Sequence, residues 1–126
     1  MRRILILLFS SLFIISCDSG VEWKDGNYEV QWIDTYKNIK LGYVLEDGFW
    51  IPRIGKTIKA IGSDAHYIVV KKYDADSSSI QFYYIIKNLD KVKTDLSPAI
   101  MGPYDIEEFL ELTFSKNLPS LSVEFL

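Results

Sequence analysis

Two neighbouring runs of residues decide the fold, HYIVVKKY at 66–73 and IQFYYII at 80–86. Both are rich in β-branched and aromatic residues, which are enriched in strands. The polar residues 74–79 between them fit a short connection, so we expect the two runs to form an antiparallel pair. The centre of the first run, Ile68 to Val70, is apolar at consecutive positions, which indicates burial on both faces. We therefore predict that the first run is a central strand.

Weaker strand patterns precede this pair. A strand that is buried on one face alternates apolar and polar residues, and several segments do so. Asp47-Gly48 fits a tight hairpin turn, and Pro52 indicates the end of a strand or an edge strand. The expected strands are residues 27–33, 39–43, 49–51 and, from a weaker pattern, 54–61.

One helix is expected near the C-terminus. Asp105 is a typical N-cap residue, and Glu108 stands at the third helical position, which is the capping-box arrangement. Lys116 and Asn117 suit the end of the helix, and Pro119 cannot continue it. Apolar residues recur at helical spacing and predict one stripe lying on the sheet. They are Ile106, Phe109, Leu110, Thr113 and Phe114.

These patterns predict a β-rich α+β fold. We expect a single antiparallel β-sheet, built as a meander of roughly five to seven strands, with one C-terminal helix packed on it. The chain has 126 residues, of which 48% are hydrophobic and 25% charged. This size and composition suit one globular domain.

The N-terminal residues have the pattern of a secretory leader. Arg2 and Arg3 precede a nearly unbroken apolar run over residues 4–15. A helix of that length reaches roughly 18 Å, well short of a hydrocarbon core of about 30 Å, so a permanent transmembrane helix is not expected. We predict that residues 1–16 are a signal peptide that is removed, 17–22 a lipidated tether, and 23–126 one globular domain.

The end of the leader, Ile14-Ile15-Ser16-Cys17, resembles the bacterial lipobox. The resemblance implies a diacylglyceryl group on the Cys17 thiol, cleavage before Cys17, and often a further acyl chain, such as palmitate, on the freed amine. Cys17 is the only cysteine, so an intramolecular disulfide is impossible. The expected location is a bacterial cell membrane, with the protein anchored by lipid and facing the periplasm or the exterior. Inner and outer membrane both stay open.

Three segments of the mature chain resemble a family of small bacterial lipoproteins grouped as domain of unknown function 3997. They are YIVVKK at 67–72, YYIIK at 83–87, and Gly102-Pro103-Tyr104 followed by Phe109. The resemblance covers roughly the C-terminal half of the mature chain, and its elements are mostly structural. It implies lipidation and a fold, and it brings no activity.

The sequence indicates no catalytic residue, no cofactor and no metal site. His66 is the only histidine, and it is expected at the start of a strand. Asp74-Ala75-Asp76 begins like a calcium-binding loop, but the loop lacks the turn glycine and the closing glutamate, so a solvated hairpin loop is expected. The net charge of −3 becomes more negative once Arg2 and Arg3 leave with the leader, which argues against nucleic acid as a partner.

A candidate binding surface consists of Trp32, Trp50 and His66. Aromatic rings exposed on a sheet are plausible contacts for a sugar or a protein, although core packing is the more common use of large rings. Three functions stay open. We expect above all a membrane-anchored, non-catalytic binding or inhibitory module whose partners are the bilayer, through acylated Cys17, and another envelope protein. The alternatives are a structural or assembly lipoprotein and a hydrolase that uses a pair of carboxylates.

Overall fold

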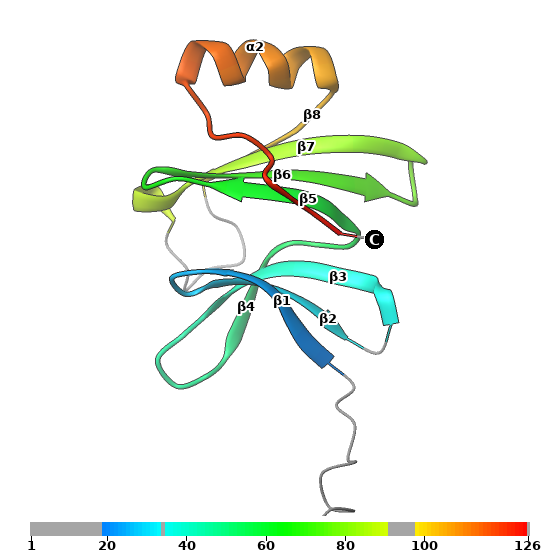
Figure 1. Ribbon diagram of the computed structural model, residues 1–126, viewed down its shortest axis with the longest axis vertical. Helices are drawn as coiled ribbons and strands as arrows, with labels where there is room; N and C mark the ends of the chain where they lie inside the picture. Colours follow the sequence, from blue (N-terminus) through cyan, green and yellow to red (C-terminus); the bar gives the residue numbers. More distant parts are fainter. Residues whose placement is uncertain (1–18, 34, 91–97, 126) are drawn as a thin grey trace, which may run out of the picture.

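The computed structural model describes residues 19–33, 35–90 and 98–125. The leader, the lipobox and Cys17 lie outside these residues. Two antiparallel sheets lie one above the other, and a helix covers the outer side of the second sheet (Figure 1). The first sheet has the order β1-β2-β3-β4, with bounds β1 (Ser19–Asp25), β2 (Tyr28–Ile33), β3 (Thr35–Val44) and β4 (Trp50–Ile54).

The second sheet has the order β8-β7-β6-β5-β9. Its strands are β5 (Ile58–Ser63), β6 (Tyr67–Asp74), β7 (Ser79–Ile86), β8 (Ile100–Tyr104) and β9 (Val123–Glu124). A short 3-10 helix, η2 (Lys87–Leu89), follows β7, and the α-helix α2 (Ile106–Lys116) follows β8.

The β-rich α+β class and the helix near the C-terminus are confirmed, but the prediction of a single sheet is wrong. The chain leaves the first sheet after β4, and β5 then pairs with β6 and β9. Alternation along a strand shows which face is buried but not which strand is its neighbour, so the break between the sheets left no mark in the pattern. In addition, residues 19–22, expected in the tether, belong to β1.

The strand pair that decides the fold forms as predicted. β6 lies between β5 and β7, and its Val70 pairs with Tyr83 of β7. Ile68 and Val70 are buried against the first sheet, whereas Val69 is buried on the opposite face, beneath α2. Burial on both faces explains why three consecutive positions of this strand are apolar.

The turn and the edge positions also agree with the prediction. Gly48 has a φ of 91°, which favours glycine, and the Leu45 N–H donates to the Phe49 carbonyl at 2.8 Å to close the β3–β4 hairpin. Pro52 lies in β4, which is an edge strand of the first sheet. Pro103, for which no edge prediction was made, lies in β8, an edge strand of the second sheet, where proline is tolerated.

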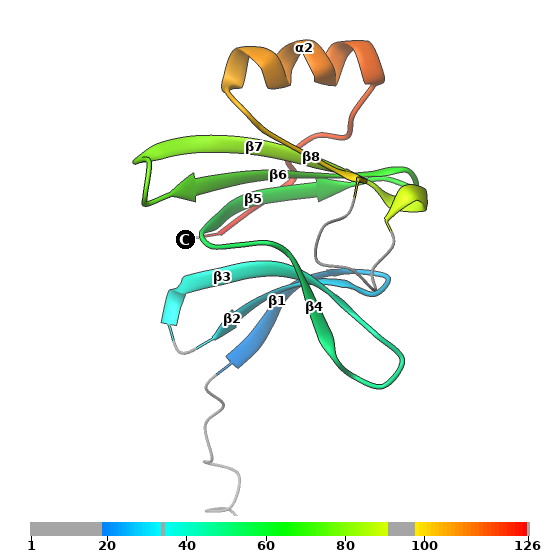
Figure 2. The same cartoon turned by 180° about the vertical axis from the view of Figure 1, so that it is seen from behind.

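Two apolar cores hold the layers together. The larger core fills the space between the sheets and includes Val30, Leu41, Ile61, Ile68 and Ile85. The smaller core lies between the second sheet and the C-terminal residues, and consists of Val69, Phe82, Tyr84, Phe109 and Leu118. The second sheet is therefore the middle layer, and α2 is the outermost layer on its side (Figure 2).

The capping box of α2 is confirmed. The Glu108 N–H donates to Asp105 Oδ1 at 2.8 Å, and the Asp105 N–H donates to Glu108 Oε1 at 3.1 Å. The helix ends at Lys116, and Asn117 follows with a φ of 56°. After α2 the chain returns to the second sheet and adds β9 beside β5. On this path the Ser120 carbonyl lies so close to Gly62 that a Cβ there would clash with it.

Candidate functional site

The structure does not gather Trp32, Trp50 and His66 on one surface. Trp32 pairs with Ile39 of β3 and Trp50 pairs with Val44, so the two lie roughly 16 Å apart along β3 at about 3.3 Å per residue. His66 belongs to the second sheet, where it precedes β6 and is exposed.

The two tryptophans also have structural neighbours. The Trp32 ring lies over Gly20 and packs against the core between the sheets. The Trp50 ring lies over Gly42, where a Cβ would clash with it. Trp50 Nε1 is buried and finds no hydrogen-bond acceptor among the described residues. Both rings are half-buried, so they contribute to packing and leave only part of their surface to solvent.

A stripe of exposed apolar side chains runs along α2, and it was missed as a surface by the sequence analysis. Ile106 is 49% exposed, Leu110 59% and Phe114 92%. The residues are spaced by four, so they lie on one side of the helix. We call these three residues the α2 stripe. Isolated exposed apolar residues are common, but three in a row on one helix face are typical of an interaction surface.

The prediction that all five apolar residues of α2 lie on the sheet is wrong for the α2 stripe. Phe109 alone is buried, and its ring stacks on Phe82 with the centroids 4.8 Å apart. Thr113 is half-buried, and its hydroxyl donates to the Phe109 carbonyl at 2.8 Å. The apolar part of α2 is therefore wider than its contact with the sheet, and one side of it faces solvent.

Carboxylates border the α2 stripe on one side. Glu107 and Glu111 each follow a stripe residue by one position, so both project from the same side of the stripe at about 100° per residue. Both are exposed, and neither forms an ion pair with another residue that the structure describes. We call these two residues the acidic border. Glu108 is not part of it, because its side chain caps the helix.

The α2 stripe lies far from the start of the described chain. β1 begins at one end of the long axis of the molecule, and α2 lies at the opposite end (Figure 1 and Figure 2). Both sheets lie between them. A chain attached to a membrane through residues before β1 would thus present α2 on the side away from its point of attachment.

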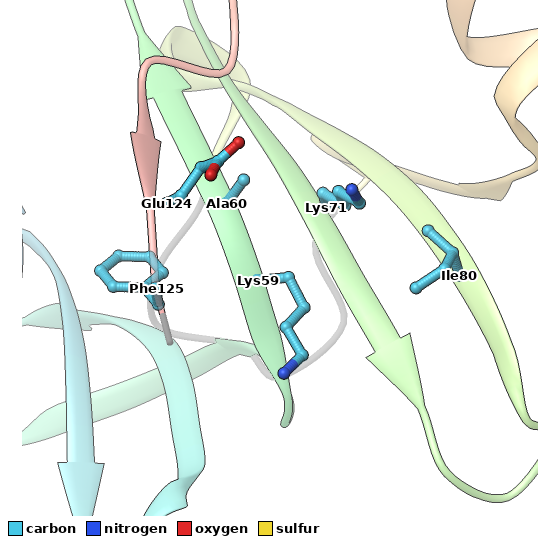
Figure 3. Close-up of a pocket in the computed structure, with 6 residues that line it drawn as sticks. All are labelled: Lys59, Ala60, Lys71, Ile80, Glu124 and Phe125. Carbon is cyan, nitrogen blue, oxygen red and sulfur yellow. The ribbon is translucent and has the colours of Figure 1, made fainter.

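A pocket of about 290 Å³ lies on the second sheet (Figure 3). Glu124 of β9 pairs with Ala60, and Ala60 pairs with Lys71, which brings these side chains together. The lining has two ammonium groups and one carboxylate, a set that suits binding of a small anion and lacks the two facing carboxylates of a glycoside hydrolase. The lining residues are Lys59, Ala60, Lys71, Ile80, Glu124 and Phe125.

A buried cluster of polar side chains joins the two sheets near η2. The Tyr28 hydroxyl donates to Asp90 Oδ2 at 2.7 Å, and Arg53 Nε lies 3.2 Å from the same oxygen. Burial, followed by the hydrogen bond to Asp90, raises the pKa of Tyr28. Tyr28 and Arg53 belong to the first sheet and Asp90 follows η2, so this cluster holds the sheets together and offers no exposed reactive group.

A second polar link lies nearby. Lys87 Nζ donates to Asp25 Oδ2 at 2.6 Å and to the Asp64 carbonyl at 2.6 Å, and so connects the β1–β2 hairpin to the second sheet. Burial alone would raise the pKa of Asp25, but hydrogen bonds from Lys87 and Ser63 outweigh it and hold the pKa below its ordinary value of 3.8. The Lys87 ammonium and the Asp25 carboxylate are therefore paired with each other, which again indicates a structural role.

Comparison of the chain with protein-family models, curated proteins and solved structures finds no match. In the part of the chain that the structure describes, no helix is long and apolar enough to cross a bilayer. Within residues 19–33, 35–90 and 98–125, no group of three or more His, Cys, Asp or Glu side chains could hold a metal ion. Among the described surfaces, the α2 stripe is the feature that most specifically indicates a function.

Proposed function

We propose that this chain is a lipid-anchored protein of a bacterial envelope that binds another envelope protein through the α2 stripe, without catalysis. The anchor is Cys17, acylated after removal of residues 1–16. The single observation that carries the binding role is the exposure of Ile106, Leu110 and Phe114 on one side of a capped, well-formed helix.

The energetics favour this interpretation of the stripe. A buried Leu, Ile or Phe side chain contributes about 1.5–3 kcal/mol relative to an exposed one. Phe114, at 92% exposure, gains almost none of this in the isolated chain. A partner that covered the stripe would bury nearly all of Phe114 and the remaining exposed half of Ile106 and Leu110, which suits the centre of an interface with a polar rim.

The position of α2 supports the combination of anchor and binding role. The tether precedes β1, and α2 lies at the opposite end of the molecule (Figure 1). In this arrangement the bilayer does not cover the stripe. A protein in the surrounding compartment can therefore reach it while Cys17 stays in the membrane.

The anchor is tested by mass spectrometry and membrane fractionation of the full chain with its own leader in bacterial cells. We expect an acylated N-terminal Cys17 in the membrane fraction, and neither the acyl mass nor a new N-terminus at position 17 in the Cys17→Ser variant. An unmodified thiol on an intact N-terminus would contradict the anchor.

The binding role is tested by photo-crosslinking in the same cells. A photoreactive phenylalanine analogue replaces Phe114, or Phe49 as the matched control, because Phe49 is 68% exposed outside α2. We expect a discrete adduct with a second protein from position 114, its loss on the added substitution Leu110→Asp, and its absence from position 49. Equal labelling from both positions, or none from 114, would contradict the binding role.

A further inference from the structure

The charges around the α2 stripe carry information about the partner. On one side of the stripe, Phe109 turns toward the second sheet. On the other side, the acidic border of Glu107 and Glu111 is exposed. An incoming surface therefore meets apolar side chains in the middle and carboxylates along one flank.

We infer that the α2 stripe docks a protein segment whose apolar side chains are bordered by Lys or Arg residues. This inference rests on the proposed function and specifies its partner. Apolar contact supplies the centre of the interface, and cations opposite Glu107 and Glu111 supply complementarity, which sets the orientation and raises the association rate. An apolar segment with an acidic border would bring like charges together at the same place.

A second copy of this chain fits the stripe less well. In a twofold-symmetric contact each residue of one copy has its equivalent in the same interface. Antiparallel contact through the two stripes would thus place Glu107 and Glu111 of both copies on the same flank of the interface. Lys116 is the only basic residue of α2, so the helix supplies little charge to offset these four carboxylates.

A bilayer fits less well for two reasons. Surfaces that bind anionic lipid are rich in Lys and Arg, whereas the border of this stripe is acidic. The stripe also lies at the end of the molecule opposite the start of β1, so the membrane that holds the anchor is on the far side (Figure 2). Both observations point to a protein partner with a basic border.

The test uses the purified full chain and three synthetic helical peptides. The first has a Leu/Phe face bordered by Lys, the second has the same face bordered by Glu, and the third has the composition of the first with its apolar residues spread around the helix. Dissociation constants are measured by fluorescence anisotropy at about 0.15 M salt, where screening beyond about 8 Å suppresses unspecific attraction.

We expect the Lys-bordered peptide to bind at least tenfold more tightly than either of the other two, which is about 1.4 kcal/mol. Phe114→Asp is expected to weaken its binding at least tenfold, whereas Phe49→Asp leaves binding unchanged. The double variant Glu107→Lys/Glu111→Lys is expected to prefer the Glu-bordered peptide. All variants alter exposed residues, and circular dichroism and thermal unfolding verify that each one folds.

Several results would overturn the inference. The Lys-bordered and Glu-bordered peptides could bind with equal affinity and both lose binding in the Phe114→Asp variant. That result would refute the charge preference but would agree with the proposed function. Equal affinity for the first and third peptides would show attraction by charge alone. Self-association of the full chain in sedimentation, abolished by Phe114→Asp, would identify a second copy as the occupant. Peptide binding that is unchanged by Phe114→Asp would show that the stripe is not the docking surface. If position 114 also gave no crosslink in cells, the proposed function would be refuted as well.

Discussion

Phe109 and Phe114 share one helix, and the structure assigns them opposite roles that can be measured. Phe109 is 5% exposed and stacks on Phe82, whereas Phe114 is 92% exposed. Removing a buried Phe side chain costs about 3–5 kcal/mol, of which an aromatic pair supplies about 0.5–1.5 kcal/mol. We therefore expect Phe109→Ala to lower the free energy of unfolding by about 3–5 kcal/mol.

Phe114→Ala is the matched control at the same helix. Substitutions on the exposed surface change stability by less than about 0.5 kcal/mol, and alanine is the better helix former, so a slight gain in stability is expected. The assay is urea unfolding of the full chain, followed by the fluorescence of its three tryptophans. A loss above about 1 kcal/mol for Phe114→Ala would refute our reasoning, because it would show that this ring is buried in the molecule in solution.

Three further predictions concern the fold that carries α2. Gly62→Ala should destabilise the chain strongly, with a fall in the midpoint of thermal unfolding, because the new Cβ would clash with the Ser120 carbonyl, which is backbone and cannot rotate away. Asp105→Ala should cost about 0.5–2 kcal/mol in urea unfolding through loss of the helix cap, whereas Asp105→Ser should cost less. The lowered pKa of Asp25 stabilises the fold above its ordinary value of 3.8, and this stabilisation is lost as the pH falls through the folded-state pKa. The unsubstituted chain should therefore lose more unfolding free energy below about pH 4 than the Asp25→Asn variant, which has no carboxylate at this position to protonate. Equal losses in the two chains would contradict the interaction of Asp25 with Lys87.

The features that sequence predicts well are local ones. The capping box joins Asp105 and Glu108, three residues apart, so residue types alone indicate it. The apolar centre of β6, Ile68 to Val70, reports burial on both faces without reference to any distant residue. In each case the signal lies within a few neighbouring positions, although the burial of β6 itself comes from the first sheet and from α2.

The division into two sheets depends on distant pairings and was not predictable in the same way. β5 does not pair with β4, which precedes it, but with β9, which follows α2 near the end of the chain. Residues 19–22 of β1 were expected in a tether because the chain is small and polar from Asp18 to Gly20. Its Gly20 leaves room for the Trp32 ring, and this contact is visible only once β2 is in place.

The α2 stripe was not predictable from the spacing of its residues. Apolar residues at i, i+3, i+4, i+7 and i+8 are typical of a helix face that packs on a core, and this spacing is followed by Ile106, Phe109, Leu110, Thr113 and Phe114. How much of such a face is covered depends on where the sheet lies, and of these five residues only Phe109 is buried. For the leader and Cys17, which lie outside the described residues, the expectations stay predictions.

The most direct test of the central claim measures whether something covers the α2 stripe in the native envelope. The only natural cysteine is Cys17, whose thiol we expect to be acylated, so Phe114→Cys introduces the one reactive thiol and Phe49→Cys serves as the matched control. Maleimide labelling is compared between isolated bacterial membranes and the purified chain. We predict that the thiol at position 114 is protected in membranes and reactive after purification, whereas the thiol at position 49 reacts in both. Equal reactivity at position 114 in membranes and in the purified chain would contradict the claim.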